Sequence, residues 1–276
     1  RLPESFTTIR MALDLFKAML DGQLKDEINV FGAFPSLFMS LVGANGEWEY
    51  YGGHLRFTDS QGNIVADNLS EDDYASFLGE AVEPWSYLKF PYYQPLGYPD
   101  GIYRVGPLAR LNVCDRIGMT AADRELQNLR DLAQGVPTSS FLYHYARLIE
   151  ILACLEHIQA LMDDSVLLSS RVRAHGGVNQ LNAIGVSEAP RGTLFHHYQV
   201  DENGLIERVN LIIATGQNNL AMNKTITQIA QAYIHHANGG HEISEGLLNR
   251  EEAGIRCLNP CLSCSTHAVG QMPLHV

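Results

Sequence analysis

The residues best suited to chemistry lie close together near the end of the chain. Cys257, Cys261, Cys264 and His267 fall within eleven residues. Four ligands with affinity for transition metals could therefore reach one ion without help from distant segments. Two residues separate Cys261 from Cys264, a spacing that lets both thiolates bind the same ion. This density predicts a metal site.

Three kinds of metal site fit these residues. A structural zinc site would use all four, although so short a segment leaves little loop to close a tetrahedron. An iron–sulfur cluster would use the three cysteines, whose spacing also occurs in enzymes that cleave S-adenosylmethionine. Those enzymes carry it early in a β/α barrel, whereas here it lies late. The third alternative uses only Cys261 and Cys264, as half of a site completed by cysteines elsewhere.

The composition limits which functions such a site could serve. Phosphate contacts need clustered Lys and Arg, whereas the 19 basic residues are scattered and the formal net charge is −12. We therefore expect no nucleic-acid partner. The sequence has no apolar run long enough to span a bilayer and no secretion signal, which predicts neither a membrane span nor export. An odd number of cysteines, mostly near one end, favours reduced thiols in the cytoplasm.

Apolar residues at helical spacing predict most of the elements that must position these ligands. Ile9, Leu13, Phe16 and Leu20 mark a first helix with Ser5 as its N-cap. Further helices are expected at 71–83, at 120–132, from Thr138 or Ser139 through Met162, from 219 to Asn238-Gly239-Gly240, and from Ile243 to Pro260.

Alternating residues predict two hairpins. The first joins 49–57 to 64–66 across the turn 59–63, and the second joins 193–200 to 205–214 across Asn203-Gly204. In the second hairpin, Val209, Leu211 and Ile213 are expected to form one buried face. The aromatic segment 85–93 reads as an irregular buried loop, and 103–112 as an extended segment that breaks at Gly106-Pro107. Together these elements predict an α+β, mainly helical fold: a helix bundle with peripheral antiparallel hairpins.

Several other polar residues could serve function or structure. Arg110 and Asn112 could position a polar group, or could form an ion pair and a turn. Cys154 and His157 are expected to be buried packing residues. The adjacent pairs His196-His197 and His235-His236 are expected to be structural, because neighbours diverge on a strand or a helix. The sequence has neither a P-loop nor a Gly-x-Gly-x-x-Gly motif, so nucleotide chemistry is expected on another chain.

The segment Pro260-Cys261-Leu-Ser-Cys264-Ser-Thr-His267 resembles the carboxy-terminal Asp-Pro-Cys-x-x-Cys-x-x-His motif of nickel–iron hydrogenase large subunits. The turn Glu188-Ala-Pro-Arg191-Gly192, followed by a hairpin and Ala214-Thr215, is similar to the family's second active-site region. The segment 104–112 resembles the cytoplasmic, cofactor-coupled group, within which the chain looks most like the bidirectional NAD-reducing subunit. The resemblance extends from about Phe31 onward.

The resemblance implies a role for each matching residue. Cys261 would be a terminal thiolate on nickel and the base that takes a proton when dihydrogen is split. Cys264 would bridge nickel and an iron that holds carbon monoxide and cyanide. Arg191 would donate hydrogen bonds to one cyanide, and the hydroxyl of Thr215 to the other. His267 would be the last residue after maturation and a ligand of a nearby magnesium ion.

The resemblance also implies partners. Diaphorase subunits and a small iron–sulfur hydrogenase subunit would carry the flavin, NAD and the iron–sulfur clusters. Maturation proteins would insert the metals, and an endopeptidase would then remove 268–276, leaving 1–267 as the carboxy-terminal portion of the large subunit. Two rival members of the fold remain: the quinone-proximal subunit of complex I, which lacks the two cysteines, and a deazaflavin-reducing or heterodisulfide-linked hydrogenase.

Three departures from the family pattern bear on activity. The family's other Cys-x-x-Cys pair and a proton-carrying glutamate lie near the amino terminus of the full subunit, and this sequence, which begins at Arg1, has no second such pair. We therefore expect a truncated chain that is inactive alone. Asn259 stands where the motif has Asp, and the segment after His267 reads as an unprocessed extension. Cys257 lies outside the motif and is expected to be a free thiol on the preceding helix.

Overall fold

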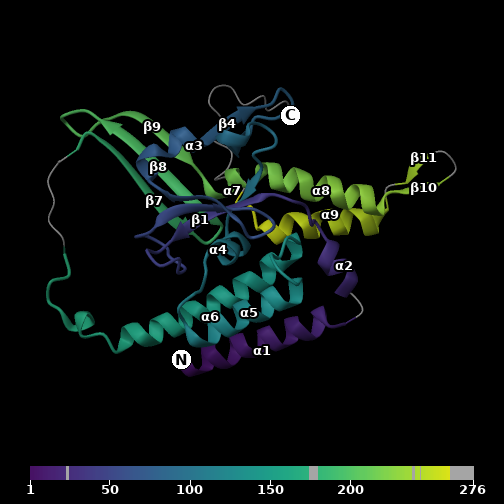
Figure 1. The fold of residues 1–276 in the computed structure, drawn as a ribbon, viewed down its shortest axis with the longest axis horizontal. Helices are drawn as coiled ribbons and strands as arrows, with labels where there is room; N and C mark the ends of the chain where they lie inside the picture. The colour runs from purple at the N-terminus through teal and green to yellow at the C-terminus, as the bar shows by residue number, and fades with distance from the viewer. Residues whose placement is uncertain (23–24, 174–179, 238–239, 243, 262–276) are drawn as a thin grey trace.

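The computed structural model describes residues 1–22, 25–173, 180–237, 240–242 and 244–261. Within this part of the chain, a layer of helices, a four-stranded sheet, a three-stranded sheet, two two-stranded sheets and a separate pair of helices make up the fold (Figure 1). This mixture of helices and antiparallel sheets confirms the α+β fold expected from the sequence. No helix of the described residues is long and apolar enough to cross a membrane.

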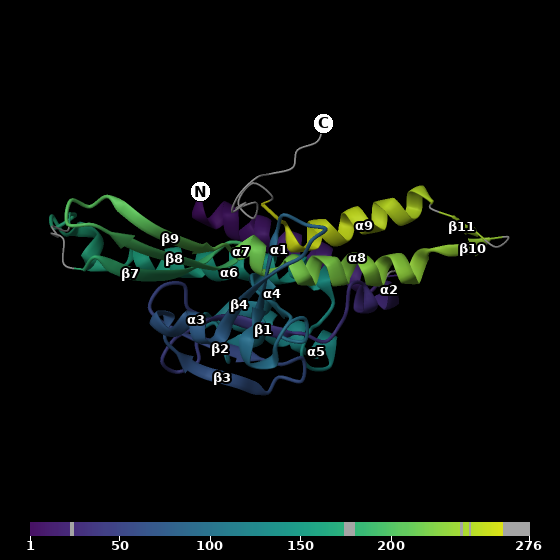
Figure 2. The same cartoon turned by 90° about the horizontal axis from the view of Figure 1, so that it is seen from above.

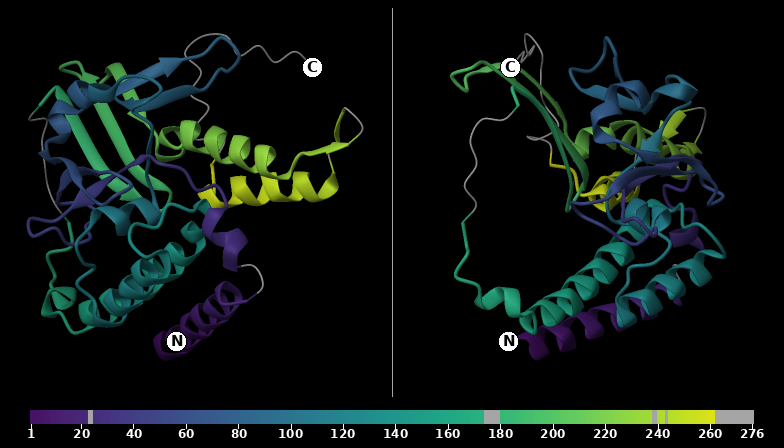
Figure 3. Two further views of the ribbon diagram at one scale, coloured as in Figure 1. Left: turned by 45° about the vertical axis from the view of Figure 1, so that its right-hand side comes forward. Right: turned by 60° about the vertical axis from the view of Figure 1, so that its left-hand side comes forward.

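The helical layer is organised around α6 (Tyr143–Met162). Helices α1 (Leu2–Leu20) and α5 (Thr120–Ala133) lie alongside it (Figures 1 and 3), and the short α4 (Pro107–Val113) packs against its buried face. Their apolar residues recur every three or four positions, so each helix turns one stripe inward. The buried stripe includes Ile9, Leu13, Leu108, Leu111, Leu126, Leu129, Ala146, Ile149, Leu152 and Ala153.

The central strand β1 (Leu37–Val42) is buried on both faces. It pairs with β2 (His54–Thr58) antiparallel and with β6 (Tyr103–Arg104) parallel, and β3 (Ile64–Leu69) completes the four-stranded sheet. Because successive side chains point to opposite faces, Phe38 and Val42 join the helical core while Met39 joins the core of the sheets. One strand thus connects the two cores.

A three-stranded antiparallel sheet, β7 (Asn182–Ala189), β8 (Gly192–Val200) and β9 (Ile206–Ile212), contacts β1. The side chain of Asp201 accepts N–H bonds from Asn203 and Leu205 and closes the β8–β9 turn. A two-stranded sheet joins β4 (Leu78–Val82) to β5 (Lys89–Tyr93). Short helical segments occur at α2 (Lys25–Val30), α3 (Tyr74–Phe77), Glu71–Asp73, Gln94–Leu96, Ser140–Leu142 and Ser165–Leu168.

The last helices form a separate pair. Helix α8 (Asn219–Tyr233) follows the short α7 (Ala214–Gln217), and α9 (Glu245–Leu258) returns beside it after the strands β10 (His235–Ala237) and β11 (Gly240–Glu242). This pair and the β7–β9 sheet extend in opposite directions from α7 (Figure 2). A Cβ at Gly254 would come within 2.6 Å of the Cδ1 atom of Ile229, so glycine permits the close approach of the two helices.

Some of the local expectations are correct. Helix α5 lies where a helix was expected, and the long α6, which follows a turn where Ser139 accepts the Phe141 N–H, lies where the apolar spacing predicts. The β2–β3 turn at 59–63 is also present, with Asp59 accepting N–H bonds from Gln61 and Asn63. These elements depend on contacts that are local in the sequence.

Other local expectations are wrong. The helix expected at 71–83 is a short helical turn followed by β4, and the loop expected at 85–93 contains β5, with Trp85 67% exposed. The segment after Gly106 is the helix α4, because proline at the first helical position begins a helix. In β9, Ile212 is buried whereas Val209 is 48% exposed. Helix α1 begins before Ser5, and α8 ends at Tyr233.

We predict that the α6 core governs the stability of the helical layer. Ile149 is fully buried, so Ile149→Ala should lower the free energy of unfolding by about 2–5 kcal/mol through lost burial and a cavity. Ile158 lies on the same helix and is 46% exposed, so Ile158→Ala should change it by less than about 0.5 kcal/mol. Urea unfolding followed by circular dichroism measures both; equal losses would contradict this packing.

Candidate functional site

The turn that carries Arg191 is fixed by close backbone contacts. It joins β7 to β8, and Gly192 adopts φ 138°. A Cβ at Gly192 would lie 2.3 Å from Val105 Cγ2, and one at Gly106 would lie 2.7 Å from the Arg191 carbonyl oxygen. Only glycines permit these distances. The turn therefore rests directly on the residues that begin α4.

The Arg191 side chain reaches the segment that follows α9. Its Nε donates a hydrogen bond to the Asn259 carbonyl oxygen at 2.8 Å. Asn259 ends the helix in the left-handed conformation, with φ 49° and ψ 55°, which asparagine tolerates better than most residues. This conformation turns the chain out of the helix immediately before Pro260 and Cys261.

Thr215 contacts the same segment from α7. Its hydroxyl oxygen accepts a hydrogen bond from the Cys261 N–H at 3.1 Å, and the side chain is almost fully buried. A hydroxyl that accepts one hydrogen bond can still donate its own proton. Two side chains from distant parts of the sequence, Arg191 and Thr215, thus contact the backbone of the three residues Asn259–Cys261.

Buried amides hold α7 in place. Gln217 accepts a bond from the Tyr103 hydroxyl at 3.0 Å and donates to the Thr193 carbonyl. Asn218 accepts from the Val105 N–H and donates to the Val105 carbonyl. Asn218 precedes α8, but its side chain makes no cap bond to that helix. In the sequence, the signal for this role was the run of three side-chain amides at 217–219 beside an apolar segment. The structure buries all three.

Of the three ligands that the motif resemblance implies, Cys261 lies within the described residues, whereas Cys264 and His267 lie outside them. Within the described part of the chain, no three His, Cys, Asp or Glu side chains gather closely enough to hold a metal. The described residues offer one cysteine, whose sulfur can bind a transition metal, and two polar side chains that contact its backbone neighbourhood and can donate hydrogen bonds.

Cys257 lies in an apolar environment on α9. It is fully buried and packs in a cluster with Phe31, Ile229 and Leu247. Burial raises the pKa of its thiol to about 12, because an apolar environment penalises the thiolate. This location does not favour a zinc site that counts Cys257 among its ligands.

Arg110 forms a buried ion pair, the structural alternative considered for it. Its guanidinium bonds Glu150 at 2.6 and 2.8 Å and Glu188 at 2.9 Å. Asn112 donates to the Pro137 carbonyl at 3.0 Å.

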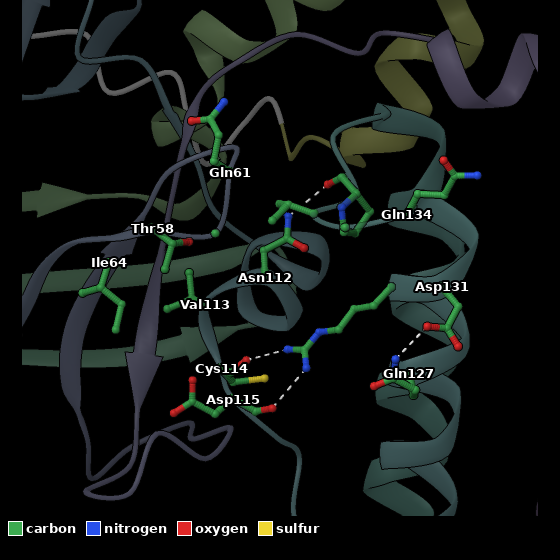
Figure 4. Close-up of a pocket in the computed structure, with 15 residues that line it drawn as sticks. Thr58, Gln61, Ile64, Asn112, Val113, Cys114, Asp115, Gln127, Asp131 and Gln134 are labelled. Atoms are coloured by element: carbon green, nitrogen blue, oxygen red, sulfur yellow. Dashed lines mark hydrogen bonds between the residues drawn. The ribbon is translucent and has the colours of Figure 1, made fainter.

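Asn112 also lines a cavity of about 690 Å³, which lies between the end of α4, the β2–β3 hairpin and α5 (Figure 4). This cavity is separate from the candidate site, because Arg191, Thr215 and Cys261 do not line it.

A second cavity, of about 500 Å³, lies beside the candidate site. It opens over the Arg110–Glu150 pair and is bordered by Asn259 and Pro190. Its other walls are mainly apolar or aromatic and include Tyr50, Tyr51, Pro107, Ile151, Cys154 and Leu155. The described residues thus leave a hollow next to the Arg191–Asn259 contact.

Cys154 and the histidines, which were expected to be structural, differ in their environments. Cys154 is half-buried, but His157 is exposed, so the expectation that it is buried is wrong. The ring of His197 bonds the Tyr74 hydroxyl and the Asn182 side chain, and His196 bonds the Tyr198 hydroxyl. His235 and His236 lie on β10 rather than on a helix.

The sequence has relatives among known proteins, although no protein-family model matches it. The chain is 42% identical over 254 residues to the NAD-reducing hydrogenase HoxS subunit beta of Cupriavidus necator, covering 91% of this chain and 51% of that protein. It is 40% identical over 268 residues to a subunit of the F420-non-reducing hydrogenase of Methanothermobacter marburgensis, covering 95% and 53%. The chain therefore spans about half the length of the curated relatives it matches.

Solved structures agree with the sequence comparison. The crystal structure of an NAD⁺-reducing NiFe hydrogenase in the H₂-reduced state matches with a TM-score of 0.89 at 42% identity, covering 97% of this chain and 58% of that one. A NiFeSe hydrogenase of Desulfovibrio vulgaris Hildenborough matches with a TM-score of 0.61 at 18% identity, covering 96% and 57%. The second likeness shows the fold alone.

We predict that Cys257 is chemically inert in the folded chain. Burial raises the pKa of Cys257 and of Cys114 to about 12, so at pH 8 both remain protonated and inaccessible to alkylation. After brief treatment with iodoacetamide and mass spectrometry, both peptides should be unlabelled in the native protein and fully labelled in urea. Rapid native labelling of Cys257 would show that α9 does not pack as described.

Proposed function

We propose that this chain, which belongs to the nickel–iron hydrogenase family, supplies part of the nickel–iron site of a hydrogenase as its large subunit, where dihydrogen is cleaved heterolytically and reversibly. The relatives at 42% and 40% identity are named hydrogenases, which supports this class of reaction. The chain covers about half of each relative, so the rest of the site would come from protein outside this sequence.

One observation carries the proposal. Arg191 on the β7–β8 turn and Thr215 on α7 both bond the backbone of Asn259–Cys261. Side chains can close a turn for structural reasons alone, as Asp201 does at the β8–β9 turn. Here two side chains capable of donating to anionic ligands instead flank a cysteine that opens a Cys-x-x-Cys motif.

This chain's share of the ligand set fits a thiolate-rich metal pair. Cys261 and Cys264 would hold nickel and an iron carrying carbon monoxide and cyanide, and His267 would bind a nearby magnesium ion. When bound, the metals would supply the Lewis acidity that polarises dihydrogen. Zinc held by all four terminal donors is less well supported, because Cys257 is buried among apolar side chains.

The chain's own residues would then position groups and move a proton. The Sγ atom of Cys261 would accept the proton, because coordination keeps a thiolate deprotonated but still basic. Arg191 uses Nε to hold the Asn259 carbonyl, and the terminal nitrogens of the planar guanidinium would donate to a cyanide. The Thr215 oxygen already accepts from the Cys261 N–H, so its proton would be directed to the other cyanide.

We further propose that electrons pass to NAD through partner subunits in the cytoplasm. The relative from Cupriavidus necator is named NAD-reducing, and the sequence has no nucleotide-binding loop of its own. Diaphorase subunits and a small iron–sulfur hydrogenase subunit would carry the NAD site, the flavin and the clusters. The described chain alone would be inactive, and an endopeptidase would remove 268–276 after maturation proteins insert the metals.

The decisive measurement is metal analysis combined with infrared spectroscopy on the full subunit in its complex. We expect nickel and iron, with absorption bands from iron-bound cyanide and carbon monoxide, and hydrogen-dependent reduction of NAD. One equivalent of zinc without such bands would refute the hydrogenase assignment. Nickel and the bands without NAD reduction would refute only the acceptor.

A pair of cysteine variants should separate metal binding from packing. In the complex, Cys261→Ser should abolish nickel incorporation and hydrogen oxidation, because a ligand is lost. Cys257→Ala should retain both, while lowering the unfolding free energy by about 1 kcal/mol through lost packing. Nickel content by mass spectrometry and thermal unfolding measure the two effects. Loss of metal in Cys257→Ala would instead favour a site that includes this thiol.

A further inference from the structure

We propose that Arg110 is a positioning residue for Arg191: its guanidinium holds the two carbonyls that precede Arg191 and thereby fixes where that side chain points. The inference rests on the proposed function, because it gives a task at the metal site to a residue that does not touch it.

Arg110 is bonded to the turn itself as well as to carboxylates. Its Nη1 donates to the Ala189 carbonyl at 2.9 Å and its Nη2 to the Pro190 carbonyl at 3.2 Å. These are the two residues immediately before Arg191. Holding both carbonyls restricts the rotation of the peptide units that lead into Arg191.

The hydrogen bonds of Arg110 use every donor of the guanidinium. Arginine has five N–H donors. Three of them bond carboxylate oxygens, two on Glu150 and one on Glu188, and the other two bond the turn carbonyls. The two donors that the carboxylates leave over are thus satisfied by the turn itself, which ties the buried pair to the residues before Arg191. Lysine, with three donors on one nitrogen, could not reproduce the arrangement.

The guanidinium of Arg110 is stabilised by the two carboxylates that it contacts. Arg110 is 1% exposed, and although burial lowers its pKa, the attraction of Glu150 and Glu188 outweighs this and raises it. Glu188 itself accepts a bond from the Leu41 N–H at 3.1 Å and one from the Thr193 hydroxyl at 2.6 Å. The guanidinium therefore stays charged and fixed between α6 and the β7–β8 turn.

Helix α4 contributes a second constraint at the same point. Gly106, whose carbonyl accepts from the Arg110 N–H one helical turn later, lies against the Arg191 carbonyl. The same helix thus holds the turn by close backbone contact at its start and by a guanidinium in its interior. Arg191 is fixed on both sides before its Nε reaches Asn259.

The test compares two buried arginines in the holoenzyme. Arg110→Lys should lower kcat about 10- to 100-fold, with nickel retained, and should shift the infrared bands of the cyanides. Arg104→Lys is the matched control, because Arg104 is fully buried and bonds Ser36, Phe34 and Thr138 rather than the turn. It should lower the thermal midpoint but leave kcat within about twofold and the bands unmoved.

Two further measurements complete the test. If Arg110 acts through Arg191, Arg110→Lys should have little additional effect in an Arg191→Lys background. If Arg110→Lys yields no loaded complex, Glu150→Gln, which keeps the side-chain shape but removes the bidentate partner, should show a smaller shift of the same bands. The proposal is overturned if the variant that incorporates nickel, Arg110→Lys or Glu150→Gln, shows unchanged cyanide bands and unchanged kcat. It is also overturned if the effects of that variant are no different from those of Arg104→Lys.

Amide hydrogen exchange separates failure of this inference from failure of the proposed function. Arg110→Lys should increase exchange across 188–194, whereas Arg104→Lys should not. A wild-type complex without nickel or cyanide bands would refute the hydrogenase function, whatever the exchange shows. Normal bands in the wild type with no increase in exchange in Arg110→Lys would refute the role of Arg110 alone.

Discussion

The buried contact between Arg110 and two carboxylates connects the elements around the candidate site. Arg110 lies on α4, Glu150 on α6 and Glu188 on β7. Removing charges from water costs several kcal/mol for each ion unless the partners are well placed. Any shift of one element would leave a buried charge uncompensated. The relative placement of α4, α6 and the β7–β8 turn is therefore narrowly defined, and the position of Arg191 follows from it.

The central strand explains why this contact can be buried at all. Because β1 turns Phe38 and Val42 toward the helices and Met39 toward the sheets, an apolar core lies on each side of the strand. The backbone of the same strand supplies the Leu41 N–H that Glu188 accepts. Apolar packing thus provides the low-dielectric environment, and the backbone provides the polar partner that makes the charge tolerable.

Sequence reasoning succeeded where contacts are local. The apolar stripes of α5 and α6 and the turn at 59–63 follow from spacing and turn chemistry. It failed where strand pairing overrides the local pattern: residues 78–82 form a strand because β5 pairs with them, and Ile212 is buried opposite Phe195. The motif resemblance singled out Arg191, Thr215 and Cys261, whereas the bonds of Arg110 to the turn carbonyls leave no pattern in the sequence.

The asparagine at position 259 illustrates how the backbone can tolerate a change in the motif. The motif that the sequence resembles has aspartate at this position. Arg191, however, donates to the main-chain carbonyl of Asn259, an acceptor that every residue provides. The left-handed conformation at this position is one that both Asn and Asp adopt with little strain. The substitution therefore removes a negative charge while preserving the contact that orients Arg191, so its effect would be electrostatic rather than geometric.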